Sequence, residues 1–356
     1  MSRYRVLYGP LNAGVASGTI AGELPAETLS VTDTLNAVGR AQVRIPLDPP
    51  VRGVSAETLY PGNTALYVER GGSFVWSGLV WTVEPDYAGG TATLNAEGWL
   101  SYYKTRFLED DQVFRQVDQA EIARSLLFYC TRHGPGSDIG VELGTETTGR
   151  LRDRTYLGSE RKQIGEAIEQ LSAVIDGFDF SFDSEWHAGR VRTVFRVHYP
   201  ARGRDRGMVL EQGRNTDIPA ATIDGTALVT AVTMVGADND DGTGPVTVSR
   251  SVPPIRTPRL EAVETHADVT ERSTLEEKAG HRLRLGTTPV TLPRIELYPE
   301  WPGFREVMVG DLVTVRGGYG LYPIDGQWRV TERAIEVDKT GAERIRVTVA
   351  TPEVFQ

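Results

Sequence analysis

Apolar and polar residues alternate along residues 29–106 in short runs that turn-forming residues separate. Five runs have the two-residue period of a strand whose successive side chains point to opposite faces: LSVTDTL, AQVRIPL, TALYVER, SFVWSGLVWTV and TATLNAEGWLSYY. The separators PG, GG and DYAGG contain the residues that tight turns require. The pattern predicts an antiparallel β-meander, folded as a barrel or a sandwich.

One of these predicted strands is apolar on both faces. Over residues 74–83, Phe74, Trp76 and Val80 alternate with a second apolar set that includes Leu79 and Trp81. A strand with one solvated face should keep that face polar. We therefore expect another domain or another chain to cover the second face.

The pattern changes to a helical period after Phe107. Residues 118–130, DQAEIARSLLFYC, predict a helix with Asp118 as its N-cap and Glu121 three positions on. Residues 159–175 predict a second helix, with Ser159 as a possible cap. The alternation that follows predicts a β-hairpin with its turn near Ala188 and Gly189. We interpret residues 108–205 as an inserted α/β domain.

The remaining segments complete a domain plan for the chain. Residues 1–107 are assigned to a first β-barrel domain, of which residues 1–28 are an arm or a peripheral loop. Strand signals within residues 206–250 are interpreted as the chain returning to complete that barrel. Residues 251–356 are assigned to a second β-barrel domain, with one helix from Ser273 to a stop at Gly286.

Two glycine-flanked strands near opposite ends of the chain have the same layout. GNTALYVERGG (residues 62–72) and GDLVTVRGG (residues 310–318) each precede an aromatic-containing strand, a glycine turn and a closing strand. Gly62 and Gly310 lie where the chain enters a strand, and the later glycine pairs permit the positive φ of a tight turn. The layout favours two related barrels, although similar layouts also arise by chance in unrelated β-meanders.

Composition and charge narrow the possible functions. The net charge of −10 argues against sequence-specific nucleic-acid binding, which normally needs an excess of basic residues. Cys130 is the single cysteine, so an internal disulfide or a multi-cysteine metal site is excluded. No apolar run has the length of a signal peptide or of a membrane span of about 18 residues, so we expect synthesis and folding in a cytoplasm.

Catalytic and metal-binding signatures are weak throughout the sequence. It contains no HExxH, GxSxG or GxxxxGK[ST] motif, and its five histidines are scattered. Glu109, Asp110 and Asp111 are adjacent in sequence, which suits a solvated loop better than carboxylates facing across a glycosidase cleft. The DNDDGTG turn (residues 238–244) lacks the ligand spacing of a calcium loop. We expect no catalytic residues, no metal and no cofactor.

Aromatic residues supply the candidate interaction site. They could fill the barrel core and a subunit interface, or they could form a flat surface that stacks on sugar rings. We favour the interface, with a cell-wall glycan-binding module as the alternative. The candidate interface residues are Trp76, Val80, Trp81, Trp99, Tyr102 and Tyr103.

The order of these features resembles the baseplate or tail-tip hub proteins of tailed bacteriophages, in particular minor tail proteins of long-tailed actinobacteriophages. The resemblance is carried by GNTALYVERGGSFVWSGLVW, LNAEGWLSYYKTR, VMVGDLVTVRGG and GQWRVTERAIEVDKTGAERIRVTVA, with the Gly98-Trp99 and Gly310-Asp311 steps. It implies a mainly β fold with an inserted α/β domain and two related antiparallel, tail-tube-like β-barrels.

The same resemblance implies a place and partners in the virion. The chain would be a homotrimer at the distal end of the tail, made in the host cytoplasm. It would join a distal tail protein or hexameric tail-tube ring above to a threefold spike, fibre or other minor tail proteins below. DNA and the tape-measure protein would pass through its lumen, and an acidic wall would repel the phosphates of DNA.

Overall fold

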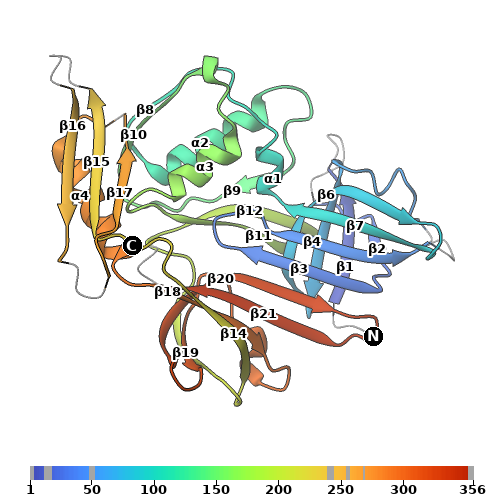
Figure 1. Ribbon diagram of the computed structural model, residues 1–356. Helices are drawn as coiled ribbons and strands as arrows, with labels where there is room; N and C mark the ends of the chain where they lie inside the picture. Colours follow the sequence, from blue (N-terminus) through green and yellow to red (C-terminus); the bar gives the residue numbers. More distant parts are fainter. Residues whose placement is uncertain are drawn as a thin grey trace. The chain divides into compact units, whose positions relative to one another are not determined.

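The computed structural model describes residues 4–11, 18–47, 53–238, 244–253, 257–267 and 269–351 (Figure 1). The described residues fold as two compact units. The larger unit lies within residues 1–217 and 295–348, and the smaller unit lies within residues 218–294 and 349–356. As predicted, the fold is mainly β, with antiparallel sheets and few helices. None of the helices among these residues is long and apolar enough to cross a membrane.

The N-terminal strands form the first of two repeats, which we call the first repeat. Their hydrogen-bonded order is β3-β4-β7-β6-β5-β1-β2, and each printed pairing is antiparallel. The five strands expected from the alternation within residues 29–106 are all present. The strands are β1 (Tyr4–Pro10), β2 (Gly22–Leu24), β3 (Thr28–Thr34), β4 (Arg40–Pro46), β5 (Thr64–Arg70), β6 (Ser73–Asp86) and β7 (Thr91–Gly98).

The N-terminal segment differs from the expected arm. β1 pairs with β5 along its whole length, from Tyr4 opposite Arg70 to Pro10 opposite Thr64. Val6, Leu7 and Tyr8 are buried. The apolar run YRVLY therefore gives a core strand, because its side chains gain more from burial than a solvated arm would offer. Residues 1–3 and 12–17 of the expected arm lie outside the described residues.

The later strands form a second repeat with the same order. This order is β14-β18-β21-β20-β19-β13, which matches β3-β4-β7-β6-β5-β1 strand for strand. The interpretation that residues 206–250 complete the first barrel is wrong, because β13 pairs in parallel with β19 of the second repeat. The strands are β13 (Asp205–Glu211), β14 (Thr216–Asp224), β18 (Val290–Leu297), β19 (Leu312–Gly317), β20 (Ile324–Val337) and β21 (Glu343–Ala350).

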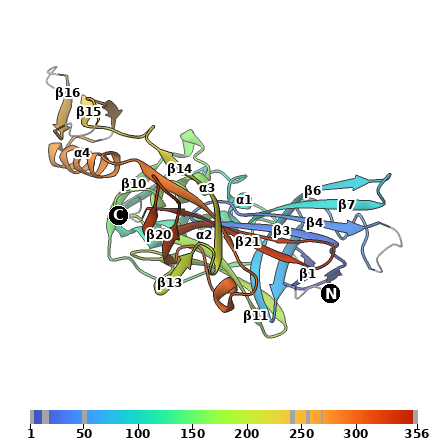
Figure 2. The same ribbon diagram turned by 60° about the horizontal axis from the view of Figure 1, so that its bottom comes forward.

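The two repeats share one continuous sheet. β20 of the second repeat pairs antiparallel with β3 of the first, from Glu332 opposite Thr34 to Val337 opposite Leu29. The long hairpins β6–β7 and β20–β21 extend in the same direction (Figure 1) and remain on either side of β3 and β4 in a second view (Figure 2). A backbone ladder therefore joins β3 of the first repeat to β20 of the second within the larger unit.

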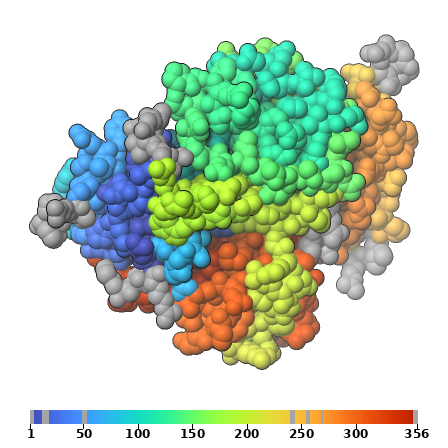
Figure 3. Space-filling model, turned by 180° about the vertical axis from the view of Figure 1, so that it is seen from behind, coloured from blue at the N-terminus to red at the C-terminus, as the bar shows by residue number. Residues whose placement is uncertain are grey.

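An α/β segment is inserted in the chain, as predicted, but it lies between the two repeats and not within the first barrel. Its residues, coloured green, gather into one continuous body beside the blue strands of the first repeat (Figure 3). β8 pairs with β10, and β11–β12 form a hairpin to which β9 adds in parallel. The elements are α1 (Leu100–Tyr103), β8 (Gln112–Asp118), α2 (Gln119–Arg132), β9 (Val141–Leu143), β10 (Leu151–Tyr156), a 3₁₀ turn (Gly158–Glu160), α3 (Ile164–Ser172), β11 (Asp179–His187) and β12 (Arg190–His198).

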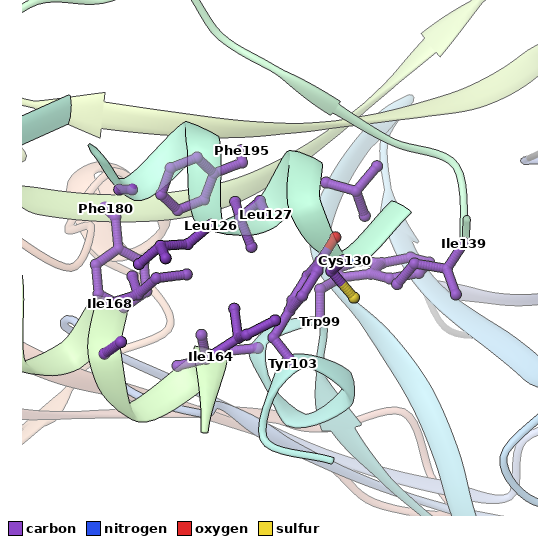
Figure 4. Close-up of a cluster of buried hydrophobic side chains, with 14 of the residues drawn as sticks. Trp99, Tyr103, Leu126, Leu127, Cys130, Ile139, Ile164, Ile168, Phe180 and Phe195 are labelled. Atoms are coloured by element: carbon purple, nitrogen blue, oxygen red, sulfur yellow. The ribbon is translucent and has the colours of Figure 1, made fainter. Parts of the chain in front are cut away.

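The insertion is built on a core between α2, α3 and the β11–β12 hairpin (Figure 4). Leu126, Ile164, Ile168, Phe180 and Phe195 are all buried there. Burying one such side chain contributes about 1.5–3 kcal/mol. This core accounts for the helical apolar stripes seen in the sequence.

Helix ends agree with the sequence in one case and differ in the other. The Asp118 side chain caps α2 by accepting from the Ala120 N–H at 2.8 Å. α3 begins at Ile164 and not near Ser159, because Arg161 adopts a left-handed φ of 49°. Residues 162–164 instead hydrogen-bond with the backbone of residues 106–108.

The smaller unit contains a three-stranded sheet covered by a helix. β15 (Ala231–Asp238) lies between β16 (Pro245–Ser251) and β17 (Glu261–Thr265), so the apolar run at residues 228–237 also belongs outside the first barrel. The expected helix is α4 (Arg272–Gly286). Its predicted face of Leu275, Ala279 and Leu283 is buried against this sheet.

Candidate functional site: the junction between the two repeats

Matched glycine–valine contacts place the two repeats in register. The Gly62 N–H donates to the Val80 carbonyl at 2.7 Å, and the Gly310 N–H donates to the Val330 carbonyl at 2.8 Å. Both glycines have positive φ, 77° and 95°, which side chains disfavour. Val80 and Val330 are fully buried. The likeness noted in the sequence is therefore a structural correspondence, and chance similarity of two meanders does not explain it.

The long strands change neighbours at these valines. β5 lies along the first half of β6, and β19 lies along the first half of β20. β6 and β20 each contain 14 residues, and their partners β7 and β21 each contain 8. Beyond Val330, β3 continues along the edge that β19 occupied. Beyond Val80, no strand of the described residues lies along the corresponding edge.

A buried ion pair joins the insertion to the second repeat at this junction. Asp179 of β11 pairs with Arg329 of β20, and their side chains are 7% and 4% exposed. Asp179 also accepts from the Asn36 amide and the Arg202 N–H, both at 2.6 Å. Arg329 donates in addition to the Arg202 and Gly310 carbonyls, at 2.9 and 3.3 Å. These charge-assisted bonds satisfy a buried carboxylate that would otherwise be costly.

A second polar network joins β21 of the second repeat to β1 and β5 of the first. Glu343 of β21 accepts from Tyr4 of β1, from Arg70 of β5 at 2.8 Å and from Arg305 at 3.2 Å. Burial raises the pKa of the Tyr4 hydroxyl well above its usual value, and the hydrogen bond to Glu343 raises it further. Burial also lowers the pKa of the Arg333 guanidinium, which lies opposite Asp33 in the β20–β3 ladder.

The candidate interface residues lie mostly in the core of this chain. Trp76, Val80, Trp99 and Tyr103 are buried. Trp81 and Tyr102 keep partial exposure, and they donate to the Ser101 hydroxyl and the Ser137 carbonyl at 2.8 and 2.9 Å. The contribution of the six residues to a subunit interface stays a prediction.

The second apolar face of β6 is covered, and the insertion covers it. Leu79 of that face is buried in the core cluster of the insertion, and Trp81 packs against the same cluster. The Ser77 hydroxyl contacts that of Ser184 at 2.7 Å and accepts from the Trp99 indole at 2.8 Å. The expectation of a covering domain is confirmed for this strand.

Burial also bears on the sugar-binding alternative. Trp76 and Trp99 line a cleft between the first repeat and β11, together with Asp183 and Arg202. The two tryptophans are only 7% and 2% exposed. Neither offers the open ring face that stacking on a sugar requires.

The acidic run after the first repeat is an exposed ion-pair network. Glu109 contacts His133 at 2.9 Å and Arg161 at 2.7 Å. The hydrogen bond from His133 and the Arg161 charge lower the pKa of Glu109. Asp111 accepts from the Gly158 N–H at 2.8 Å. These carboxylates lie exposed on the segment before β8, which agrees with the loop interpretation.

Metal ligands are not gathered in the part of the chain that the structure describes. No group of three or more His, Cys, Asp or Glu residues there could hold a metal ion. Most of the DNDDGTG turn, residues 239–243, lies outside the described residues.

Sequence reasoning missed the polar residues of the junction. Asp179, Arg329, Arg333 and Glu343 are all polar residues on strands with little or no exposure. One signal was available in the sequence. Arg329 and Arg333 lie in a strand whose other residues include the apolar Ile335 and Val337. An arginine among inward-facing apolar residues indicates a buried partner.

Comparisons with known proteins support the fold. The structure matches a 43 kDa tail protein of prophage MuSo2 from Shewanella oneidensis, with a TM-score of 0.67 and 14% identity over 99% of this chain and 100% of that one. It also matches a tail protein of Neisseria meningitidis MC58, with a TM-score of 0.62 and 12% identity over 99% and 98% of the two chains. The chain has the fold of phage tail proteins.

A third neighbour belongs to a secretion system. The E. coli c3393 protein is a component of the type VI secretion system and is structurally similar to the T4 phage tail proteins gp27 and gp5. It matches with a TM-score of 0.52 and 12% identity, over 97% of this chain and 76% of that one. No family model and no curated protein matches the sequence. The narrower likeness to actinobacteriophage tails stays a prediction.

Proposed function

We propose that this chain is a structural phage-tail protein that forms a homotrimeric hub at the distal end of the tail. The observation that carries the proposal is the repeat. Each chain contains two repeats of the same strand order, joined edge to edge through β3 and β20. Three chains supply six similar repeats around one axis, so their ring can meet a sixfold tube on one side and a threefold spike or fibre on the other.

The structural neighbours support a place in the tail. They include tail proteins of prophages and a secretion-system component similar to T4 gp27 and gp5. The fold alone is shared at these identities. The internal repeat supports a symmetric assembly independently of that fold.

Surface features support assembly with other tail proteins. The β19–β20 loop exposes Tyr319, Leu321 and Tyr322, and Leu321 is 90% exposed. Such a group of apolar side chains suits contact with another protein, here a tail-tube ring, distal tail protein or spike. The net charge of −10 suits a lumen through which DNA and the tape-measure protein pass without sticking.

The proposal assigns no catalytic step and no cofactor to the chain. It also sets aside the glycan-binding module, because Trp76, Trp99 and Tyr103, three of the five aromatic residues on which that alternative depends, are buried. In this proposal, the exposed surfaces and strand edges of the chain make the contacts of the trimer and of the tail.

Two measurements test the hub. Light scattering of the purified chain should give three times the 39.1 kDa chain mass, and electron micrographs should show rings with six lobes. Immunogold labelling of phage particles should place the chain at the tail end distal to the capsid. A chain that stays monomeric at every concentration, together with particles that carry no gold, contradicts the proposal.

A further inference from the structure

Two strand edges in the larger sheet correspond to the pair that joins the repeats. Within the chain, β20 and β3 pair along residues 332–337 and 29–34. In the strand order of the repeats, β6 corresponds to β20, and β14 corresponds to β3. In the part of the chain that the structure describes, no strand lies along the second half of β6 on the side away from β7, and none lies along the side of β14 away from β18.

The matched valines locate the edge on β6. The Val80 carbonyl accepts from Gly62, as the Val330 carbonyl accepts from Gly310, so both point to the side that β5 or β19 occupies. In the second repeat, β3 takes over that side from Glu332 onward. The corresponding residues of β6 start at Thr82, after a bulge between Val80 and Thr82.

Backbone geometry shows which groups this edge presents. Pro85 lies opposite Ala92 of β7 and has no N–H to donate to that strand. A proline in a strand lies with its nitrogen on the unpaired side. Since alternate residues present their backbone groups to the same side, the N–H and carbonyl of Val83 and the carbonyl of Pro85 face the edge.

Burial differs between the two edges in the way that a missing strand predicts. Beside β3, Arg333, Ile335 and Val337 are buried. On β6, Pro85 is exposed, and Tyr87 just beyond it is 86% exposed. An unpaired edge whose backbone N–H and carbonyl groups face outward is a site for strand addition.

We infer that the outer edge of β6, residues 82–86, pairs antiparallel with β14 of a second copy of this chain. The pairing repeats between chains the β20–β3 pairing found within the chain. β14 suits this place because it is the last strand beside β18, as β3 is beside β4, and because Ala220, Thr222 and Ile223 are exposed. The inference rests on the proposed trimer and assigns its interface.

The resulting contact joins unlike surfaces of neighbouring copies. β6 of one copy takes β14 of the next, so each copy uses both edges. A head-to-tail contact either closes into a ring or grows into a filament. With two repeats in each copy, a ring of three copies places six repeats edge to edge, which is the ring of the proposed hub.

Engineered disulfides test this pairing in the full chain. In a Cys130→Ser background, Glu84→Cys is combined in turn with Ala220→Cys, Ala221→Cys or Thr222→Cys. Cross-strand disulfides require Cα atoms about 4.4–6.8 Å apart, so mild oxidation should link chains into dimers and trimers in one or two of these combinations. Glu84→Cys with Thr247→Cys on exposed β16 is the matched control and should stay unlinked.

A backbone substitution tests the edge without sulfur chemistry. Val83→Pro removes the N–H that faces the edge, so light scattering should show loss of the trimer. Val83→Ala keeps the N–H and should remain trimeric. Circular dichroism of both variants should match the wild type, which separates lost assembly from lost folding.

The outcomes separate this inference from the proposed function. A trimeric wild type whose cysteine pairs all stay unlinked, and whose Val83→Pro variant stays trimeric, overturns the β6–β14 pairing and leaves the hub standing. A wild type that is monomeric at all concentrations overturns both.

Discussion

The first and second repeats have the same strand order, yet their long strands end in different surroundings. In the second repeat, β3 covers the edge of residues 332–337, and Ile335 and Val337 are buried. In the first repeat, Glu84, Pro85 and Asp86 are exposed at the corresponding place. The local pattern of turns and strands therefore sets where a strand runs, whereas a neighbouring strand determines which of its edges is buried.

The repeats also differ in how they attach to the insertion. The residue before the matched valine is Leu79 in the first repeat and Arg329 in the second, and both are buried. Arg329 needs Asp179 of the insertion as its partner, whereas Leu79 packs in the apolar core. At this matched position, the first repeat thus contributes apolar packing to the insertion, and the second contributes a buried ion pair.

The largest predicted effect comes from making the second repeat like the first. Arg329→Leu copies the residue of the first repeat but leaves Asp179 buried without its cation. Breaking a buried pair in this way costs about 3–5 kcal/mol. Urea unfolding followed by circular dichroism should show this loss in the free energy of unfolding.

A double variant separates the orphaned charge from the lost packing. Asp179→Leu combined with Arg329→Leu removes both charges, so its cost should be smaller than the sum of the two single costs. If Arg329→Leu alone lowers the free energy of unfolding by less than about 1 kcal/mol, the ion pair does not hold the junction.

The matched glycines predict a smaller and unequal effect. Alanine at either position must adopt a left-handed φ, which costs roughly 1–2 kcal/mol. At Gly310 the new Cβ would also lie 2.5 Å from the Arg202 carbonyl oxygen, whereas at Gly62 the nearest atom is 3.8 Å away. Gly310→Ala should therefore cost about 1–3 kcal/mol more than Gly62→Ala in the same urea experiment. Equal costs would contradict the closer backbone contact at the second glycine.

Much of the first repeat could be predicted from the sequence because its signals are local. Alternation and glycine turns gave all five strands expected within residues 29–106, and the cap at Asp118 gave the start of α2. The repeat itself was visible because Gly62 and Gly310 must be glycines at their positive φ.

The errors concern contacts between residues far apart in sequence. β13 pairs with β19, which lies about 100 residues later in the chain, and nothing in the sequence of β13 indicates that partner. The same holds for Asp179 and Arg329, which come from different segments. The predicted start of α3 near Ser159 was also wrong. Residues 162–164 hydrogen-bond with the backbone of residues 106–108, so the helix begins only at Ile164.

The smallest predicted effect concerns the turn that ends the second long hairpin. The Asp338 carboxylate accepts from the Thr340 hydroxyl and N–H at 2.6 and 2.8 Å and from the Ala342 N–H at 3.0 Å. The hydrogen bond from the Thr340 hydroxyl, with that of the Ala342 N–H, lowers the pKa of Asp338. In the first hairpin, Asp86 accepts from the Gly89 N–H at 2.8 Å.

Asp338→Asn should therefore loosen the second turn and leave the first unchanged. A carboxyl group whose pKa is lowered on folding stabilises the fold above its unfolded pKa, and this contribution is lost as pH falls through the folded pKa. Hydrogen exchange should show faster exchange of the Thr340 and Ala342 amides in Asp338→Asn near neutral pH, and the difference from wild type should shrink below about pH 4. The Gly89 amide serves as the internal control. If it changes as much as Ala342, the two hairpins are coupled, and the comparison between the repeats must include that coupling.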